Sequence, residues 1–476
     1  MTFSRKIGLL LGPLLFLIIV NLPSFLVSEK GDAVIAVALW MVTWWITETV
    51  HIAVTALLPL ILFPLLKVME IADVGANYGS PIIFLFFGGF VLALALEKVN
   101  LHKRIALTII KYTGTTPNKV ILGFMIATAF MSMWISNTAS TVVMLPIAIS
   151  VIKLLIDDAD GFTKGDKNFA LSIMLGIAFS ANAGGIATVI GTPPNSVLIG
   201  LLENQYNIEI SFLKWMSFGL PFSIVMVALV YLVLVKWMFP CNDIQFTSSS
   251  NLISEELKKL GKISKEEKRV LIIFAVTVFL WVTRTLINKI FPGLKLSDTI
   301  ISLIAAVSLF SIPLSLKKGS YILKWDDTQR LAWGILILFG GGLALAKGMA
   351  ASGLVDVITN TIAEGNFNPI ITVSLLIILM LFMTELMSNV ALISVLAPVV
   401  AGIAIGLNIP ILNVLIPVTM ASSCAFMLPM ATPPNAIVFA SGYVKVKEMV
   451  KAGVILNVFA VALLILYYMF VLPMFL

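Results

Sequence analysis

The sequence predicts an all-α polytopic membrane protein with about eleven transmembrane helices plus two re-entrant hairpins, arranged as an inverted repeat. Three observations lead to this prediction. Of the 476 residues, 60% are hydrophobic and only 12% are charged, which leaves too few polar side chains for a water-soluble exterior. Apolar stretches of bilayer length recur along the whole chain. Several short motifs occur twice in the same order, once in each half of the chain.

A membrane crossing needs about 20 apolar residues. The candidate spans are 7–27, 33–48, 52–67, 80–97, 168–202, 212–239, 270–291, 298–316, 331–348, 411–440 and 452–475. The first span could pass for a signal peptide, but no A-x-A cleavage site follows it. We therefore interpret residues 1–30 as a retained N-terminal transmembrane helix.

Two further apolar stretches, 119–156 and 369–407, each carry a Ser-Asn pair near the middle. We interpret both as re-entrant hairpins that enter and leave the membrane on one side. With a cytoplasmic N-terminus and the C-terminus outside, this scheme places 24 of the 31 Lys and Arg residues in the cytoplasm. Such asymmetry is typical of a multi-pass protein of the cell (inner) membrane, and it fades if the hairpins are counted as spans.

An internal repeat relates the two halves. FFGGF at 86–90 matches LFGGG at 338–342, and Ser136-Asn137-Thr138 matches Ser388-Asn389-Val390, both at an offset of 252 residues. GTPPN at 191–195 matches ATPPN at 431–435 at an offset of 240. These markers predict a first repeat over 31–240, a polar cytoplasmic linker over 241–269 and a second repeat over 270–476. Each repeat has an odd number of crossings, so the second copy is inverted, as in secondary transporters.

The repeated motifs also indicate a chemistry. The pairs Pro193-Pro194 and Pro433-Pro434 remove backbone donors and unwind a helix, and lipid tolerates the exposed carbonyls only where they line a cavity. The Ser-Asn tips are good N-caps, so we expect a new helix to begin at each one. Helix N-termini suit an anion, whereas carbonyls, hydroxyls and amide oxygens suit Na⁺. The alternative is that these motifs are ordinary interhelical hydrogen-bonding patches.

A few other polar residues are notable. Glu48 and Glu385 lie within apolar runs, where a carboxylate is a functional candidate. We expect a structural acceptor at a helix break, with a proton relay as the alternative. The two histidines, His51 and His102, fall at predicted helix ends with no partner for metal binding. Cys241 and Cys424 suggest no disulfide framework.

The motifs ISNTASTVVMLP, GTPPN, TELMSNVALISVLAP and ATPPN together resemble the divalent anion/sodium symporter (DASS, INDY-type) family of dicarboxylate transporters. The resemblance implies a homodimer in membrane lipid and an elevator-type alternating-access motion. It implies a first sodium site at Ser132, Ser136, Asn137 and the backbone of Gly191, and a second at Thr384, Asn389 and the backbones of Met387 and Ala431. The substrate residues that it implies are Asn137, Thr138, Thr192, Asn389, Val390, Thr432 and Pro433. Val390 departs from the Thr found in some members.

The leading functional hypothesis is sodium-coupled symport of a C4 dicarboxylate of the succinate, malate and fumarate class, with Na⁺ co-transported and no organic cofactor. Within the family, a cation-independent dicarboxylate exchanger and a citrate or sulfate carrier remain as alternatives, and an ion channel is the alternative from another class. An enzyme is not expected, because the sequence has no nucleophile–base pair, HExxH motif or carboxylate pair. Nucleic acid is not an expected partner, because the basic residues lie in short loops.

Overall fold

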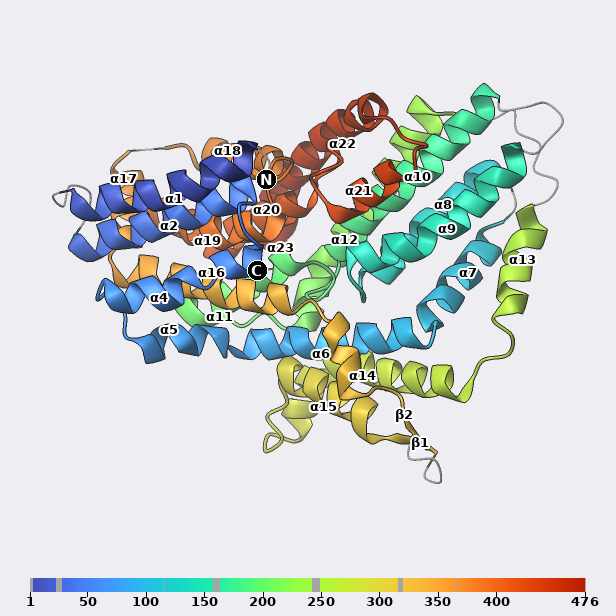
Figure 1. Cartoon of the computed structure of the whole chain (residues 1–476), viewed down its shortest axis with the longest axis horizontal. Helices are drawn as coiled ribbons and strands as arrows, with labels where there is room; N and C mark the ends of the chain where they lie inside the picture. Colours follow the sequence, from blue (N-terminus) through green and yellow to red (C-terminus); the bar gives the residue numbers. More distant parts are fainter. Residues whose placement is uncertain are drawn as a thin grey trace.

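The computed structural model describes residues 3–22, 28–114, 116–156, 163–241, 249–315, 320–365 and 367–475, and almost all of them are helical (Figure 1). The first half contains α1 (Phe3–Asn21), α2 (Glu29–Thr47), α3 (Ile52–Thr55), α4 (Leu58–Leu65), α5 (Ile71–Tyr78), α6 (Pro81–Lys98), α7 (Leu101–Thr113), α8 (Pro117–Ser132), α9 (Asn137–Ile156), α10 (Lys164–Gly185), α11 (Pro193–Tyr206), α12 (Phe212–Tyr231) and the π-helix η1 (Leu232–Met238).

The linker helix α13 and the second half of the chain supply the other elements. The remaining elements are α13 (Ser249–Lys259), α14 (Lys265–Ile290), α15 (Asp298–Ser311), the antiparallel strands β1 (Pro313–Ser315) and β2 (Ser320–Tyr321), the 3-10 helix η2 (Trp325–Arg330), α16 (Trp333–Ala351), α17 (Leu354–Glu364), α18 (Pro369–Met383), α19 (Asn389–Gly406), α20 (Ile411–Ser423), α21 (Pro433–Ala440), α22 (Val446–Leu466), the π-helix η3 (Tyr467–Val471) and α23 (Leu472–Phe475).

Within the described ranges, seven helical segments are long and apolar enough to cross a membrane. They are 3–21, 71–98, 212–238, 265–290, 333–351, 389–406 and 446–474. Five shorter apolar helices accompany them, so this is a multi-pass membrane protein. The total of eleven crossings stays a prediction, and so does the orientation of the termini. The predicted span 52–67 is divided in the structure into α3 and α4.

Both predicted hairpins are pairs of helices and not continuous rods. In the first, α8 ends at Ser132 and α9 begins at Asn137; in the second, α18 ends at Met383 and α19 begins at Asn389. The hydroxyl of Ser136 accepts the backbone N–H of Ala139 at 3.2 Å and so caps α9 as expected. Both arms of the first hairpin pack against α10 (Figure 1). That both arms of each hairpin enter from one membrane face remains a prediction.

The two TPPN motifs interrupt helices, as their prolines predict. The chain unwinds over 186–192 between α10 and α11, and again over 424–432 between α20 and α21. Pro193 and Pro433 are the first residues of the new helices, where a missing N–H costs no intrahelical hydrogen bond. The predicted spans 168–202 and 411–440 are therefore broken helices.

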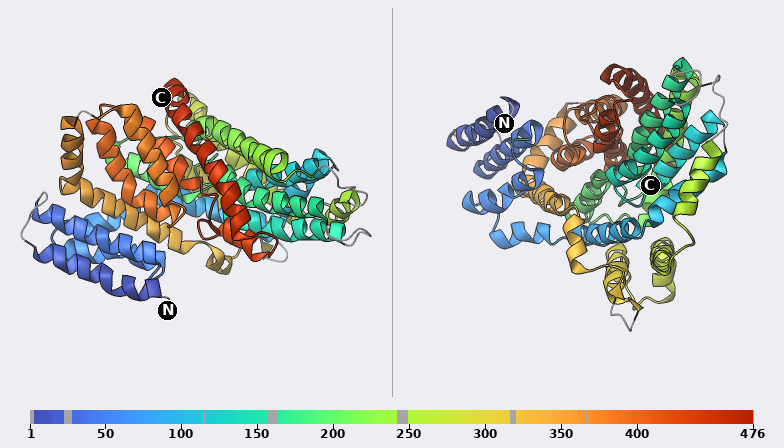
Figure 2. Two further views of the ribbon diagram at one scale, coloured as in Figure 1. Left: turned by 90° about the horizontal axis from the view of Figure 1, so that it is seen from above. Right: turned by 45° about the vertical axis from the view of Figure 1, so that its right-hand side comes forward.

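The two halves of the chain interlock crosswise. Helix α9 of the first half packs against α21 of the second, and α11 of the first half packs against α19 of the second. The two further views show the orange and red helices of the second half in contact with the green and teal helices of the first (Figure 2). This arrangement brings helices that begin at a hairpin tip against helices that begin at a Pro-Pro break.

The linker between the halves is docked and not freely solvated where the structure describes it. Helix α13 lies against α7, with Ile253 buried between them. Arg104 of α7 forms an ion pair with Glu267 at 2.7 Å, and Lys103 pairs with Glu256 at 3.1 Å. Hydrogen bonds from Lys259 and Lys103 lower the pKa of Glu256 from its usual value. Residues 242–248 of the predicted linker lie outside the described part of the chain.

Candidate functional site

The first cluster of predicted sodium ligands forms where the hairpin tip meets the first helix break. One end of the Asn137 side-chain amide lies 2.5 Å from the hydroxyl oxygen of Ser132, 3.2 Å from the carbonyl oxygen of Gly191 and 3.3 Å from that of Ala181. The Ser132 hydroxyl also donates to the Ala181 carbonyl at 2.7 Å. Residues from α8, α9, α10 and the break after α10 therefore converge on one point.

The orientation of the Asn137 amide decides what this point can hold. With its nitrogen there, the amide donates to Ser132 Oγ and to the Ala181 and Gly191 carbonyls. With its oxygen there, four oxygen atoms face one another and share the single hydrogen of the Ser132 hydroxyl. Such a set is stable only if a cation neutralises the repulsion, and oxygen-only ligation suits a hard cation.

The second cluster repeats this geometry in part. The Thr384 hydroxyl, fully buried, donates to the carbonyl of Ser422 at 2.7 Å, just as Ser132 donates to Ala181. Met387 and Ala431, whose backbones are the other predicted ligands, are buried as well. Asn389 is half-buried at the first turn of α19. The shared hydrogen bond of Thr384 is the part of the first cluster that the second repeats, and the second sodium site stays a prediction.

Burial separates the predicted cation residues from most of the predicted substrate residues. Ser132, Gly191, Thr384, Met387 and Ala431 are buried. The tip residues at the helix starts are more accessible. Asn137, Thr138, Asn389 and Val390 are half-buried, and Pro433 and the predicted sodium ligand Ser136 are exposed, whereas Thr192 and Thr432 are buried. A cation in either cluster would therefore lie deeper than an anion held at the tips.

The unwound carbonyls of each break are satisfied by the asparagine that ends the TPPN motif. Asn195 donates to the carbonyls of Thr188 at 2.8 Å and Ile186 at 3.3 Å. Asn435 donates to the carbonyls of Ala425 and Leu428, both at 3.1 Å. Sequence reasoning missed these two residues as part of the site. The signal was present, because Asn ends both copies of the motif at the same offset as the prolines.

Glu385 has the structural role that was expected of it. Its buried carboxylate accepts the backbone N–H groups of Phe426, Met427 and Leu428 at 2.8–3.1 Å, and also the side-chain amide of Asn457. It therefore joins the second hairpin tip to the second break. At the equivalent junction of the first half, the Thr188 hydroxyl donates to the carbonyl of Met133 at 2.6 Å.

The other polar residues singled out in the sequence lie elsewhere. Glu48 ends α2 in the left-handed backbone region, is exposed, and lies 3.5 Å from the guanidinium of Arg5. His51 accepts the N–H of Ala53 and caps α3. His102 is buried on α7, where its ring nitrogen Nδ1 lies 2.9 Å from the Leu96 carbonyl oxygen. These residues take no part in the two clusters.

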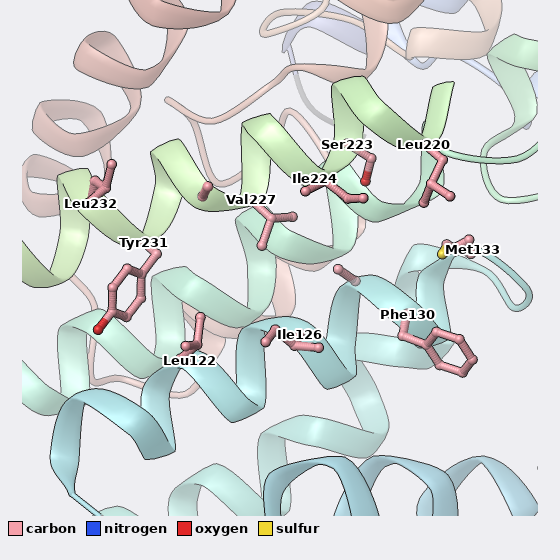
Figure 3. Close-up of a pocket in the computed structure, with 12 residues that line it drawn as sticks. Leu122, Ile126, Phe130, Met133, Leu220, Ser223, Ile224, Val227, Tyr231 and Leu232 are labelled. Carbon is pink, nitrogen blue, oxygen red and sulfur yellow. The ribbon is translucent and has the colours of Figure 1, made fainter. Parts of the chain in front are cut away.

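A large groove on the surface is separate from the clusters. Its volume is about 550 Å³, and it runs between α8 and α12, with Leu122, Ile126 and Phe130 along one wall and Ile224 and Val227 along the other (Figure 3). The lining is mostly apolar, with the hydroxyls of Ser223 and Tyr231 as its polar side-chain groups, and suits a hydrocarbon chain better than a dicarboxylate. We assign no substrate to it.

The paired breaks and the crosswise packing are the architecture of a secondary membrane transporter. The family model described as "Sodium:sulfate symporter transmembrane region" matches residues 4–475. The chain belongs to this family. It is 42% identical over 478 residues to the sodium-dependent dicarboxylate transporter SdcS of Staphylococcus saprophyticus, covering 99% of this chain and 92% of that protein. The protein of the same name from Staphylococcus aureus (strain USA300) is 40% identical over 479 residues, with the same coverage.

Two solved structures share the fold at 12% sequence identity. The Alcanivorax borkumensis YdaH transporter has a TM-score of 0.58, covering 83% of this chain and 87% of that one. The Neisseria gonorrhoeae protein MtrF has a TM-score of 0.52, covering 98% of this chain and 95% of that one. At this identity, the similarity concerns the fold alone.

Proposed function

We propose that this protein is a secondary active transporter that couples the entry of Na⁺ to symport of a C4 dicarboxylate of the succinate, malate and fumarate class. The observation that carries the proposal is the convergence of the Ser132 hydroxyl, the Asn137 side-chain amide and the carbonyls of Ala181 and Gly191 on one point, where the amide would turn its oxygen toward a bound cation. The staphylococcal relatives, which are named sodium-dependent dicarboxylate transporters, support the same coupling.

The cation acts as part of the anion site in this proposal. Na⁺ in the first cluster would be held by Ser132, Ser136, Asn137 and the Gly191 backbone, and in the second by Thr384, Asn389 and the backbones of Met387 and Ala431. The first of these sites would lie at the tip where Ser132 and Asn137 meet, and the second at the corresponding tip between α18 and α19. A positive charge there offsets the repulsion between a dianion and the surrounding carbonyls, because electrostatic attraction is strong where water is excluded. Loading of Na⁺ therefore favours binding of the dianion.

The dianion would be held by helix N-termini rather than by arginine or lysine. Helices α9, α11, α19 and α21 begin at Asn137, Pro193, Asn389 and Pro433. The N-termini of α9 and α19 present free N–H groups and a partial positive charge. Helices α11 and α21 begin with two prolines, which have no N–H, so they would contribute their dipoles and the hydroxyls of Thr192 and Thr432. Asn137, Thr138 and Thr192 would bind one carboxylate, and Asn389, Val390, Thr432 and Pro433 the other. A dicarboxylate of four carbons has one charged group for each half of the repeat.

Alternating access by an elevator-type movement and assembly as a homodimer are further parts of the proposal. The interlocked pairs α9–α21 and α11–α19 support a single mobile body, because neither half can move away without exposing a broken helix. Cross-linking of purified protein in lipid would test the dimer. The cytoplasmic N-terminus is testable by cysteine labelling of either terminus in sealed cells.

Uptake by proteoliposomes tests the function directly. Labelled succinate should accumulate with an inward Na⁺ gradient and should not accumulate with a K⁺ gradient. Uptake that does not depend on Na⁺ but requires dicarboxylate inside the vesicles would instead establish a cation-independent dicarboxylate exchanger. Competition by citrate or sulfate at lower concentration than succinate would establish the other carriers of the family, and flux that does not saturate would establish a channel.

A further inference from the structure

Asn182 of α10 is a first-half residue whose side chain is bound to the second half. It is 1% exposed. Its amide nitrogen donates to the Thr432 hydroxyl at 3.0 Å, to the Ala425 carbonyl at 3.1 Å and to the Asn435 side-chain oxygen at 3.3 Å. All three acceptors belong to the break between α20 and α21 or to the first turn after it. Among the described residues, its own side-chain oxygen has no hydrogen-bond partner, so the second half alone orients this amide.

The residue directly before Asn182 belongs to the first cluster. The carbonyl of Ala181 accepts the Ser132 hydroxyl and faces the Asn137 amide. Consecutive residues of one helix thus touch both halves of the candidate site. A cation bound by the Ala181 carbonyl would shift or stiffen α10 at the point from which the Asn182 side chain reaches Thr432.

Two accepted hydrogen bonds fix the direction in which the Thr432 hydroxyl group can donate its hydrogen. Its hydroxyl oxygen accepts the Asn182 amide and also the backbone N–H of Asn435 at 3.4 Å. A threonine hydroxyl has one hydrogen and two acceptor positions. With both acceptor positions used, the remaining hydrogen is free to point toward an anion at the N-terminus of α21.

This link has no counterpart in the opposite direction. The second-half positions that correspond to Asn182 are Ser422 by the offset of 240 and Ser423 by the matching Ser132 and Thr384 hydrogen bonds. The Ser422 hydroxyl donates within its own helix to the Thr419 carbonyl, and the Ser423 hydroxyl has no hydrogen-bond partner among the described residues. The first break is tied by Asn195 and by Trp215, which donates to the Ile186 carbonyl at 3.0 Å. Both are residues of the first half. The second break is therefore the one that depends on the other half of the chain.

We propose that Asn182 is a positioning residue that couples the first cation cluster to the anion-binding hydroxyl of Thr432. This inference rests on the proposed sodium-coupled dicarboxylate transport. Asn182 acts through Thr432 and not by contact with either ion. Loss of its amide would leave Thr432 free to rotate and would weaken the effect of Na⁺ on anion binding.

A double-mutant cycle in proteoliposomes tests this coupling. The KM for succinate is measured at low and at saturating Na⁺ for the wild type, Asn182→Ala, Thr432→Val and the double variant. We expect Asn182→Ala to raise the KM about tenfold at saturating Na⁺, the effect of one lost buried hydrogen bond. We also expect the lowering of KM by Na⁺ to shrink in this variant, and the double variant to match Thr432→Val within about twofold.

The controls separate this inference from the function on which it rests. Ser180→Ala, a buried change on the same helix, should keep the wild-type KM and Na⁺ response. If Asn182→Ala elutes as an aggregate, Asn182→Ser, which has the residue of the equivalent position, replaces it. Wild-type uptake without Na⁺ dependence overturns the proposed function. If wild-type uptake depends on Na⁺ but the Asn182→Ala variant keeps the wild-type KM and Na⁺ response, the coupling alone is overturned. The same holds if the rise in KM of the double variant equals the product of the rises in the two single variants.

Discussion

The carboxylate of Glu385 accepts the side-chain amide of Asn457 at 2.8 Å, deep inside the second half. Neither residue is near the surface, since Glu385 is 2% exposed and Asn457 is 0% exposed. The same carboxylate accepts three consecutive backbone N–H groups of the second break. A single side chain therefore replaces the hydrogen bonds that the break has lost, and Asn457 fixes its orientation from α22.

Replacement of Glu385 by Ala should strongly destabilise the protein. It leaves three N–H groups without an acceptor, at about 1–3 kcal/mol for the buried one of Phe426 and less for the half-buried ones of Met427 and Leu428. Asn457→Ala removes one donor and should cost less. Thermal unfolding of the detergent-purified variants measures both effects. Glu364→Ala, at the exposed end of α17, is the matched control and should have the same unfolding temperature as the wild type. A Glu385→Ala variant as stable as this control would contradict the structural role.

Asn137→Ala should abolish sodium-dependent uptake while the protein remains folded. The change removes the only side-chain amide of the first cluster within the described chain, and with it the oxygen that would complete the proposed cation site. Thermal shifts in Na⁺ against K⁺ measure cation binding without transport. Ser150→Ala on the exposed side of the same helix is the control and should keep the wild-type shift. Asn389→Ala should behave as Asn137→Ala does, and wild-type uptake by either variant would remove the site assignment.

Val390→Thr should change the anion preference more than the Na⁺ affinity. Val390 is half-buried beside Asn389 at the start of α19, so a threonine there adds a hydroxyl at the predicted anion site. One added hydrogen bond to a charged group is worth about 1.5–3 kcal/mol. Competition of labelled succinate with malate, citrate and sulfate measures the preference. A variant with altered Na⁺ dependence and the wild-type order of anions would show that the position has another role.

Gly191→Ala should raise the Na⁺ concentration needed for half-maximal uptake. A Cβ atom at Gly191 would lie only 2.5 Å from the Gly185 carbonyl oxygen and 2.9 Å from that of Ser132, so the backbone of the first cluster must move. Gly75→Ala is the matched control, because a Cβ there meets nothing within 4 Å. It should leave the Na⁺ response unchanged, and it should stabilise α5 by up to about 1 kcal/mol. Equal Na⁺ responses of both variants would contradict the assignment of Gly191.

The sequence predicts the helix breaks well, because Pro-Pro pairs and Ser-Asn pairs have strong local effects on the backbone. It predicts less well what satisfies each break. The role of Asn195 and Asn435 could have been inferred from the repeat, since both end a TPPN motif. Asn182 could not, because its contacts join residues about 250 positions apart and the equivalent residue is a serine. The division of 52–67 into two helices did have a signal, because Pro59 is the second residue of α4, a position typical of proline at a helix start.

The crosswise packing of α9 on α21 and of α11 on α19 has a consequence for biosynthesis. The first half, with its hairpin tip and its TPPN break, is synthesised before the second-half helices α19 and α21 that pack against it. Until the second half is inserted, the polar backbone groups of the first tip and the first break lack these packing partners. We therefore expect a chaperone or an insertase to bind the nascent first half. A chain truncated after the linker should be degraded rapidly, and separate expression of the missing half should rescue it.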